Sequence, residues 1–328
     1  MGFDRGIGRR KPGAARKGTC CLGGFPKIMK IALIHNPNAF RGDANGTDLR
    51  RLFERAGHDV AYVSTEESDW RRVISPEIVR AVIVGGDGTV QSVAPNLKGT
   101  PFSILPFGTA NNIAHCLHQT SDPELLASQL DEAEIRPLDL GRVTHRSGTQ
   151  TFLEATGAGV FVELIRTMQK WPKKVELEQA ESRKEKFAHA LQQLQTITRE
   201  YEGMELELKV DDSVIKDRFI LLAAMNTELI GPKLHLAPDA DPSDGFLDLV
   251  FVREEHRTKL CRWLECQLPG QKHAAQLENR RCRRVEVCGG NTAPVHIDSG
   301  LVQSWDFPLT IELEPAALQY LGLKRTKK

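Results

Sequence analysis

The sequence has few of the features that mark secreted, zinc-stabilised or membrane-spanning proteins. Its seven cysteines are odd in number and none stands in a Cys-x-x-Cys pair, so neither a disulfide framework nor a zinc site is favoured. No run approaches the roughly 18 apolar residues that a membrane-spanning helix needs. The net charge of +1 gives no argument for nucleic acid as a partner. We therefore expect a cytoplasmic protein with reduced thiols and no transmembrane segment.

The remaining composition is that of a globular chain with an unusual beginning. The 328 residues are 40% hydrophobic and 27% charged, which suffices for one or two domains with a real core. In residues 1–28, arginine and lysine are interspersed with glycine and proline, and no apolar segment accompanies them. This stretch is not a secretory signal. We expect a disordered basic leader, and the alternative is a tether to anionic lipid.

After the leader, strand patterns alternate with helix patterns. Short apolar runs predict strands at Lys30–His35, Asp59–Val63, Ala81–Val84 and Phe102–Leu105. Segments between them have helical periodicity, as in Asp48–Ala56,. This alternation favours a doubly wound, mostly parallel sheet, in which ligands bind beyond the carboxyl ends of the strands. We assign an α/β nucleotide-binding domain to residues 29–135.

From about Pro137 the pattern changes to short strands and hairpin turns. The strand candidates are Thr149–Ala155, Met204–Val210, Arg218–Met225, Phe246–Val252, Arg284–Cys288 and Leu309–Leu313. They favour a β-rich sandwich domain with inserted helices over residues 136–328. We expect the final strands to return to the first domain.

The predicted helix at Leu177–Tyr201 has two interpretations. Its apolar residues recur at roughly helical spacing, which is typical of a helix that packs on a core. Three basic residues near its start, Arg183, Lys184 and Lys186, could instead hold it on an anionic lipid surface. We favour core packing.

The segment Gly85–Thr89, with the sequence Gly-Gly-Asp-Gly-Thr, directly follows the third predicted strand and precedes a helix. Glycine lets the backbone turn sharply and lets phosphate oxygens approach its N–H groups. The helix N-terminus adds partial positive charge, and Asp87 offers oxygen ligands for Mg²⁺. The segment therefore predicts a phosphate-binding loop, and the alternative is a tight strand–helix turn.

A second loop, Pro106–Asn112, follows the fourth strand in the same way. Thr109, Asn111 and Asn112 supply uncharged hydrogen-bonding groups there. Helix capping by Thr109 and Asn111 is the alternative. Two such loops on successive strands are less expected by chance than one, which favours a shared nucleotide site.

Two acidic segments lie further along the chain. Four carboxylates crowd into Ala237–Asp248, and a bound Mg²⁺ or Ca²⁺ would relieve their repulsion. An exposed acidic turn is the alternative. In Val295–Gly300 a predicted strand delivers Asp298 into a turn. An aspartate so placed can accept a proton from an attacking hydroxyl, although a simple turn aspartate is the commoner case.

Taken in order, these four segments resemble the diacylglycerol kinase catalytic-domain family, which includes bacterial diacylglycerol kinases, related lipid kinases and sphingosine kinases. The resemblance extends from about Lys30 to Leu323 and includes Leu138–Gly141 and Ala155–Gly159. It implies an active site between the two domains. It also implies ATP-dependent transfer of a γ-phosphoryl group to a lipid hydroxyl, on a diacylglycerol-like or sphingoid acceptor, with Mg²⁺ as the second cofactor.

The resemblance also implies roles for individual residues. Asp298 and Asp87 would be catalytic, and a Mg²⁺ site would form from Asp241, Asp244 and Phe246, the first and last through backbone carbonyls. The residues expected around ATP are Asn36, Thr65, Gly85, Gly86, Asp87, Gly88, Thr89, Gln91, Ser92, Gly108, Thr109 and Asn111. The protein would reach its lipid substrate by peripheral contact with the inner face of the membrane. A homodimer is compatible with these expectations.

The chain departs from the family pattern at two positions. The family usually has Asp-Gly-Glu where this chain has Asp298-Ser299-Gly300, so a candidate proton acceptor is missing. Asn112 stands where aspartate is more common. Two alternatives therefore stay open: a kinase for a soluble acceptor such as NAD, and a catalytically weak lipid- or nucleotide-binding pseudokinase.

Overall fold

The computed structural model describes residues 28–39, 45–146, 148–170, 181–267, 276–289, 293–305 and 307–323. The basic leader expected at residues 1–28 lies outside these residues, apart from Ile28.

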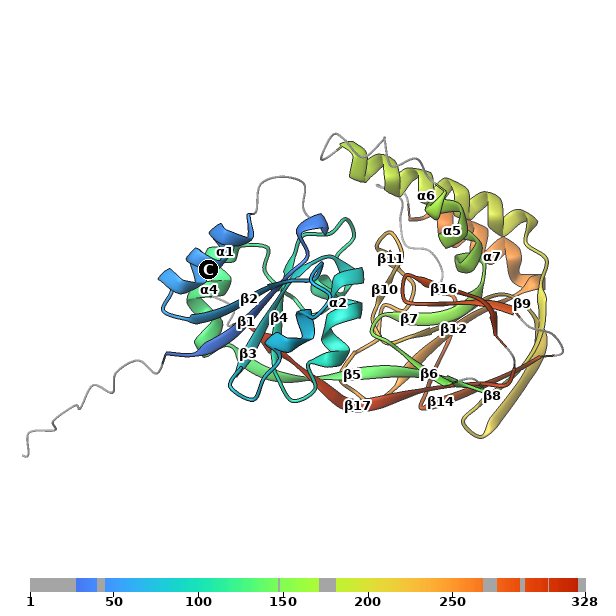
Figure 1. The fold of residues 1–328 in the computed structure, drawn as a ribbon. Helices are drawn as coiled ribbons and strands as arrows, with labels where there is room; N and C mark the ends of the chain where they lie inside the picture. Colours follow the sequence, from blue (N-terminus) through green and yellow to red (C-terminus); the bar gives the residue numbers. More distant parts are fainter. Residues whose placement is uncertain are drawn as a thin grey trace, which may run out of the picture.

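The first part of the chain forms a parallel sheet with the strand order β2-β1-β3-β4. Its strands are β1 (Lys30–His35), β2 (Asp59–Ser64), β3 (Arg80–Gly85) and β4 (Phe102–Pro106). Its helices are α1 (Gly46–Arg55), α2 (Asp87–Val93), α3 (Asn112–Cys116) and α4 (Pro123–Gln129). Side chains of α1 and α4 pack on one face of the sheet, and those of α2 and α3 on the other. Figure 1 shows α1, α2 and α4 around these strands. The predicted doubly wound α/β arrangement is confirmed.

The second part of the chain is rich in antiparallel strands. These are β5 (Glu134–His145), β6 (Gly148–Phe152), β7 (Ala155–Gly159), β8 (Met204–Val210), β9 (Ser213–Met225), β10 (Leu229–Ile230), β11 (Leu234–His235), β12 (Leu247–Arg253), β13 (Glu278–Cys282), β14 (Arg284–Gly289), β15 (Ala293–Ile297), β16 (Gly300–Trp305) and β17 (Leu309–Gly322). The predicted β-rich second part is confirmed as well.

The long strand β17 joins the two parts of the chain. It pairs antiparallel with β5 and β14, and it reaches β4 in parallel through Tyr320 and Phe102. The pairing with β5 is interrupted between Glu314 and Leu318. Because of β17, 15 of the described strands belong to one continuous sheet. In Figure 1, β5 and β17 run side by side beneath both parts.

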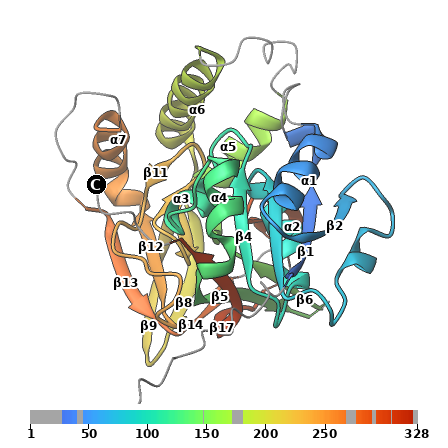
Figure 2. The same ribbon diagram turned by 90° about the vertical axis from the view of Figure 1, so that its left-hand side faces the viewer.

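Three helices cover the β-rich part on one side: α5 (Val160–Gln169), α6 (Glu181–Glu200) and α7 (Arg257–Glu265). Both ribbon views place α6 and α7 on the same side of the strands (Figure 1 and Figure 2). Leu191 and Leu194 of α6 are buried in the cluster beneath, and Phe187 and Ile197 pack against it. The apolar side of α6 thus faces the core, as favoured from the sequence. The side chains of Arg183, Lys184 and Lys186 lie outside the described residues.

The predicted strand Thr149–Ala155 is confirmed as far as Phe152 but was extended too far, because the chain bends after that residue. Strand β6 ends at Phe152 and β7 begins at Ala155. Between them, the N–H groups of Leu153 and Glu154 point to a carboxylate instead of a neighbouring strand. This bend is part of the candidate site described below.

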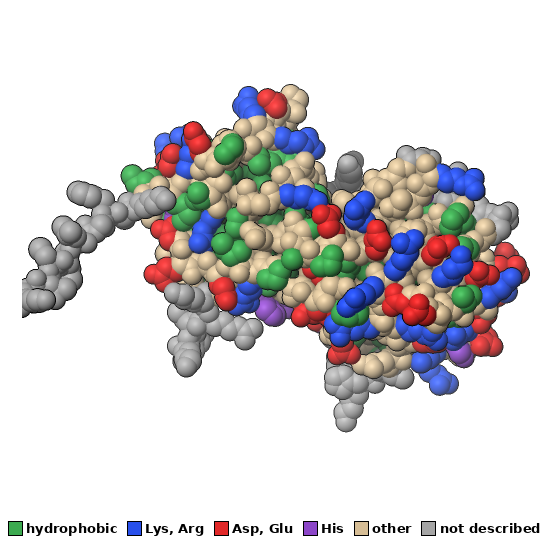
Figure 3. Space-filling model, turned by 90° about the horizontal axis from the view of Figure 1, so that it is seen from below, with side chains coloured by type: hydrophobic (Ala, Val, Ile, Leu, Met, Phe, Trp, Pro, Cys, Tyr) green, Lys and Arg blue, Asp and Glu red, His purple; other side chains and the backbone are tan. Residues whose placement is uncertain are grey.

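We consider the described helices and the face of the molecule drawn in Figure 3 for features of a membrane or charged partner surface. None of the described helices combines the length and apolarity needed to cross a bilayer. On the face drawn in Figure 3, Lys and Arg side chains are intermingled with Asp and Glu side chains over the right-hand part of the view. On this face, charges of both signs therefore offset each other.

Candidate active site

The carboxyl ends of the four parallel strands gather most of the residues expected around ATP. Asn36 follows β1 and Thr65 follows β2. The N–H of Thr65 donates a 2.8 Å hydrogen bond to the carbonyl of His35. The loops Gly85–Thr89 and Pro106–Asn112 follow β3 and β4. Because neighbouring parallel strands end at one edge of the sheet, these groups share that edge.

The two glycine-containing loops touch each other through their backbones. A Cβ atom added at Gly86 would lie 2.8 Å from the Cα of Gly108, and one added at Gly108 would lie 2.5 Å from the Cα of Gly86. The N–H of Phe107 also donates to the carbonyl of Gly85 at 2.9 Å. Contacts this short leave no room for a side chain, so the glycines are required for the approach of the two loops.

Side chains at the same edge hold the loops in shape. Asn111, with φ +54°, accepts from the N–H of Gly108 at 2.8 Å and donates to the carbonyl of the same residue at 3.0 Å. Asparagine tolerates this left-handed conformation better than most residues. Asn36 donates to Thr89 Oγ1 at 2.8 Å. The remaining predicted residues of this edge that are exposed to solvent are Gly88, Ser92 and Thr109.

Asp87 connects the first loop to the second. Its Oδ1 accepts the N–H of Ile113 at 3.1 Å, in the first turn of α3. Burial raises the pKa of Asp87, while N–H groups of this turn and the ammonium of Lys233 partly oppose that rise. Sequence reasoning did not predict that Asp87 caps α3. The binding of Mg²⁺ by Asp87 stays a proposal.

Asp298 lies in the turn between β15 and β16 and binds the bend between β6 and β7. Its Oδ1 accepts from the N–H of Glu154 at 2.8 Å and of Ala155 at 3.2 Å, and its Oδ2 accepts from the N–H of Leu153 at 3.0 Å. Its own φ is +51°. Burial raises the pKa of Asp298 to about 6, although these N–H groups lower it and the charge of Asp87 raises it further. This carboxyl therefore titrates near neutral pH.

Glu154 is a buried acidic residue that sequence reasoning missed. Its Oε1 accepts a hydrogen bond from Asn112 Nδ2 at 2.9 Å, and the same amide donates to the carbonyl of Gly231 at 2.9 Å. Burial, followed by the charges of Asp87 and Asp298, raises the pKa of Glu154 well above its usual value. The only signal in the sequence is an isolated acidic residue between apolar neighbours.

We call Asp87, Glu154 and Asp298 the carboxyl cluster. The charges of Asp87 and Asp298 raise the pKa of Glu154, and the charge of Asp87 raises that of Asp298. A further contact spans the same region, because Ser299 Oγ donates to Gln91 Oε1 at 2.8 Å. This bond joins the Asp298 turn to α2, behind the first glycine loop. The predicted catalytic turn and the predicted nucleotide loops therefore lie at one site.

The acidic segment between β11 and β12 has its charges partly satisfied within the protein. Asp241 Oδ1 accepts from Ser243 Oγ at 2.6 Å, and the carbonyl of Asp241 accepts from the N–H of Asp244 at 3.4 Å. Asp244 accepts from the N–H of Phe246 at 2.9 Å and pairs with Arg281 at 2.6 Å. Within the described residues, no group of three or more His, Cys, Asp or Glu side chains is placed to hold a metal ion. A cation at Asp244 would have to displace Arg281.

Buried polar residues connect this acidic segment to the carboxyl cluster. The carboxyl of Asp139 accepts the N–H groups of Gly245 and Ala316, each at 2.7 Å. Asn226, which is 1% exposed, donates to the carbonyls of Asp139 at 3.2 Å and Leu153 at 2.9 Å. Asn226 was also missed from the sequence. The acidic segment is therefore tied to the bend that Asp298 holds.

Two family models match this chain, one on each part. The diacylglycerol kinase catalytic domain matches residues 30–143. The YegS C-terminal NAD kinase beta sandwich-like domain matches residues 173–322. Together the matches take in both glycine loops, the acidic segment and the Asp298 turn.

Relatives and solved structures agree with these matches. The chain is 26% identical over 313 residues to a protein named diacylglycerol kinase from Mycobacterium tuberculosis, covering 90% of this chain and 96% of that protein. It is 24% identical over 256 residues to one from Bacillus subtilis, covering 74% and 80%. A crystal structure of a diacylglycerol kinase from Bacillus anthracis str. Sterne shares the fold, with a TM-score of 0.69 at 20% identity, over 91% of this chain and 98% of that one. With matches on both parts and relatives along nearly its whole length, this chain is similar to diacylglycerol kinases, and its first part matches the catalytic domain of that family.

Proposed function

We propose that this chain is an ATP-dependent lipid kinase that phosphorylates a hydroxyl group of a diacylglycerol-like or sphingoid lipid. The observation that carries this proposal is the meeting of the two glycine loops with the Asp298 turn at one edge of the sheet. The relatives named diacylglycerol kinase support the same reaction class. The acceptor would be reached by peripheral contact with a membrane surface.

The nucleotide would bind across the two loops. Phosphoryl transfer needs positioning and charge neutralisation more than covalent help from the protein. N–H groups of the loops would hold the phosphate oxygens, because their glycines allow close approach. Magnesium, when bound with ATP, neutralises phosphate charge, and Asp87 is the carboxylate that would hold it. A second Mg²⁺ site is proposed at Asp241, Asp244 and Phe246. There the metal would replace Arg281 as the partner of the Asp244 carboxylate.

In the transfer step, Asp298 would accept the proton of the acceptor hydroxyl. The acceptor oxygen forms a bond to the γ-phosphorus, and the bond from that phosphorus to the bridging oxygen breaks, so ADP leaves with the electron pair. The proton of the acceptor hydroxyl passes to Asp298, whose Oδ2 accepts an N–H from Leu153 and retains a lone pair,. A pKa of about 6 for Asp298 suits a general base at neutral pH.

A kinase for a soluble acceptor is the second candidate. The description of the C-terminal family model, which names an NAD kinase-like sandwich, favours it. The two candidates differ in the acceptor alone, since both would use the same nucleotide loops.

The experiment that tests the proposal incubates the purified chain with radiolabelled ATP and a total lipid extract, and in parallel with NAD. We expect a labelled lipid that is absent with Asp87→Asn, a variant that keeps an acceptor for the α3 cap. Labelled NADP without labelled lipid would replace the proposal with the second candidate. ATP binding without transfer to either acceptor would make the chain a pseudokinase and contradict both.

A further inference from the structure

A lysine with unusual backbone geometry lies beside the carboxyl cluster. Residues 231–233 connect β10 to β11, and the pairing of Ile230 with Leu234 closes this short hairpin. Within it, Lys233 has φ +59° and is exposed. A residue other than glycine loses stability in this conformation, and such residues are concentrated where a protein grips a ligand.

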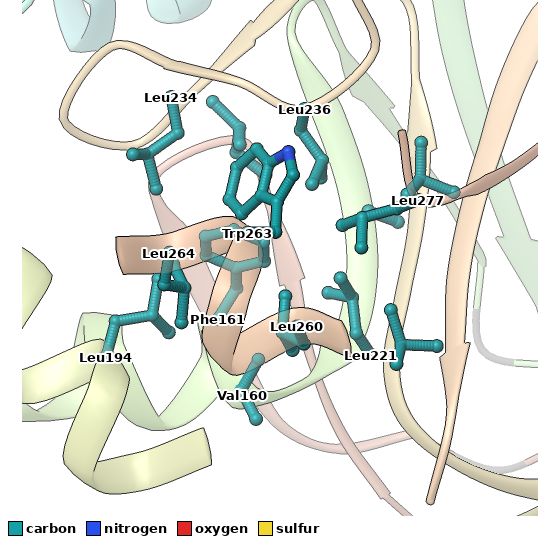
Figure 4. Close-up of a cluster of buried hydrophobic side chains, with 14 of the residues drawn as sticks. Val160, Phe161, Leu194, Leu221, Leu234, Leu236, Leu260, Trp263, Leu264 and Leu277 are labelled. Carbon is teal, nitrogen blue, oxygen red and sulfur yellow. The ribbon is translucent and has the colours of Figure 1, made fainter. Parts of the chain in front are cut away.

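The hairpin is fixed on both sides. Leu234 is fully buried and Leu236 is 4% exposed, and Figure 4 shows both beside Trp263 of α7 in the cluster beneath the helices. On the other side, Asn112 at the start of α3 donates to the carbonyl of Gly231 at 2.9 Å. The loop is therefore anchored in the β-rich part and docked on the second nucleotide loop. This anchoring holds the Lys233 backbone in one place.

The hairpin places Lys233 next to the carboxyl cluster. Lys233 lies two residues after Gly231, and the Asn112 amide that donates to the carbonyl of Gly231 also donates to Glu154 at 2.9 Å. The carboxyl cluster contains three acidic groups, and an ATP bound there would add several more negative charges. Within the described residues Lys233 forms no ion pair at 4.0 Å or less. Its ammonium is therefore available to a ligand.

We propose that Lys233 is a phosphate-binding residue, and that its ammonium contacts the terminal phosphates of the nucleotide opposite the two glycine loops. This inference rests on the proposed nucleotide site. Lysine binds phosphate as a compact point charge on a flexible stem. The hairpin belongs to the β-rich part, whereas the loops belong to the α/β part, so Lys233 would close the site over the γ-phosphoryl group. It forms no bond during transfer and acts by neutralising charge.

The test is calorimetric titration of the full chain with AMP, ADP, a non-hydrolysable ATP analogue and inorganic tripolyphosphate. Lys233→Asn removes the charge while keeping a residue that tolerates positive φ. Lys233→Arg keeps the charge, and Lys216→Asn removes an exposed charge on β9 as the matched control. We expect Lys233→Asn to weaken the binding of the ATP analogue and tripolyphosphate about 10- to 100-fold and to leave the affinity for AMP unchanged. Lys233→Arg should retain part of the lost affinity.

The outcomes separate the inference from the proposed function. Equal affinity of the wild type and Lys233→Asn for the ATP analogue and tripolyphosphate overturns the inference and leaves the lipid kinase proposal intact. Binding of tripolyphosphate that depends on Lys233, in a wild type that phosphorylates no lipid, supports the inference while the kinase proposal fails. An equal loss in Lys216→Asn would assign the effect to overall charge and overturn the inference.

Discussion

Asn112 and Glu154 share a 2.9 Å hydrogen bond inside the core, and this bond joins the second glycine loop to the bend held by Asp298. Asn112 contributes an amide to this contact, and Glu154 contributes the carboxyl that accepts from it. Both side chains are buried, at 1% and 6% exposure. A buried pair of this kind holds the second glycine loop and the Asp298 turn at a fixed separation.

Glu154→Gln is expected to fold with the stability of the wild type or better at neutral pH. Glutamine still accepts from Asn112, and it removes a carboxyl whose pKa is raised by burial and by neighbouring charges. A raised native pKa favours folding at low pH, and this contribution is lost as the pH rises above the unfolded value of about 4.5. Thermal denaturation at pH 5 and pH 8 should therefore show a gain for the variant that grows with pH.

Two further variants complete this test. Glu154→Ala leaves the amide of Asn112 without its partner and should cost about 1–3 kcal/mol of unfolding free energy. The exposed Glu205→Gln serves as the control and should change little at either pH. Loss of stability in Glu154→Gln at both pH values would contradict the raised pKa of this carboxyl.

Gly108→Ala should destabilise the protein and Gly88→Ala should not. A Cβ at Gly108 would lie 2.5 Å from the Cα of Gly86, and backbone atoms must move to admit it, whereas a Cβ at Gly88 meets nothing within 4 Å. We expect a loss of about 1–3 kcal/mol for the first variant. The second lies in α2, where alanine is favoured over glycine by about 0.5–1 kcal/mol. Denaturant titration measures both, and equal stabilities would rule out the contact between the loops.

The turnover of the wild type should rise with pH around a midpoint near 6. Asp298 must be ionised to accept a proton, and burial raises its pKa to about 6. Asp298→Asn should reduce kcat by about 10²–10⁴-fold, and its residual activity should lose this pH dependence. A pH–rate profile of the kinase assay provides the measurement. A profile that is flat between pH 5 and 8 in the wild type would exclude Asp298 as the base.

The contribution of Asp298 to stability has the opposite pH dependence from its contribution to turnover. Because the native pKa of Asp298 lies above the unfolded value of about 3.8, the contribution of this group is greatest below pH 4 and is lost as the pH rises through about 6,. Asp298→Asn should flatten this part of the stability curve, which thermal denaturation between pH 4 and 8 would record. Parallel stability curves for the wild type and Asp298→Asn over this range would contradict a raised pKa of Asp298.

Arg281→Ala should increase the affinity of the acidic segment for Mg²⁺. Arg281 pairs with Asp244 at 2.6 Å and its guanidinium lies 4.1 Å from the ring centre of Phe246, so it occupies the place of a cation. Its removal frees a carboxylate of Asp244. The rise in Tm with MgCl₂ should be larger in this variant than in the wild type, and Asp244→Asn should abolish it. Identical shifts in all three proteins would remove the proposed second metal site.

Local patterns in the sequence were sufficient for the α/β part. The strand Lys30–His35 has the predicted bounds, and β3 and β4 extend the predicted strands by one or two residues. Apolar runs and glycine positions depend on neighbouring residues, so they can be recognised without the rest of the chain.

The bend at Glu154 could not be recognised in the same way. It exists because Asp298, 144 residues away, accepts the N–H groups that a continuous strand would have used. Lys233 and Asn226 likewise gain their positions from contacts with distant strands and helices. Such contacts leave no periodic pattern, so sequence reasoning did not single out these residues, whereas it did single out those of the glycine loops.

The central claim is that both glycine loops hold the phosphates of one nucleotide, and a crystal structure with a non-hydrolysable ATP analogue and Mg²⁺ tests it most directly. We expect phosphate oxygens within about 3 Å of N–H groups from both Gly85–Thr89 and Pro106–Asn112, with the terminal phosphate facing Asp298. A nucleotide bound to a single loop, or bound away from this edge of the sheet, would contradict the claim.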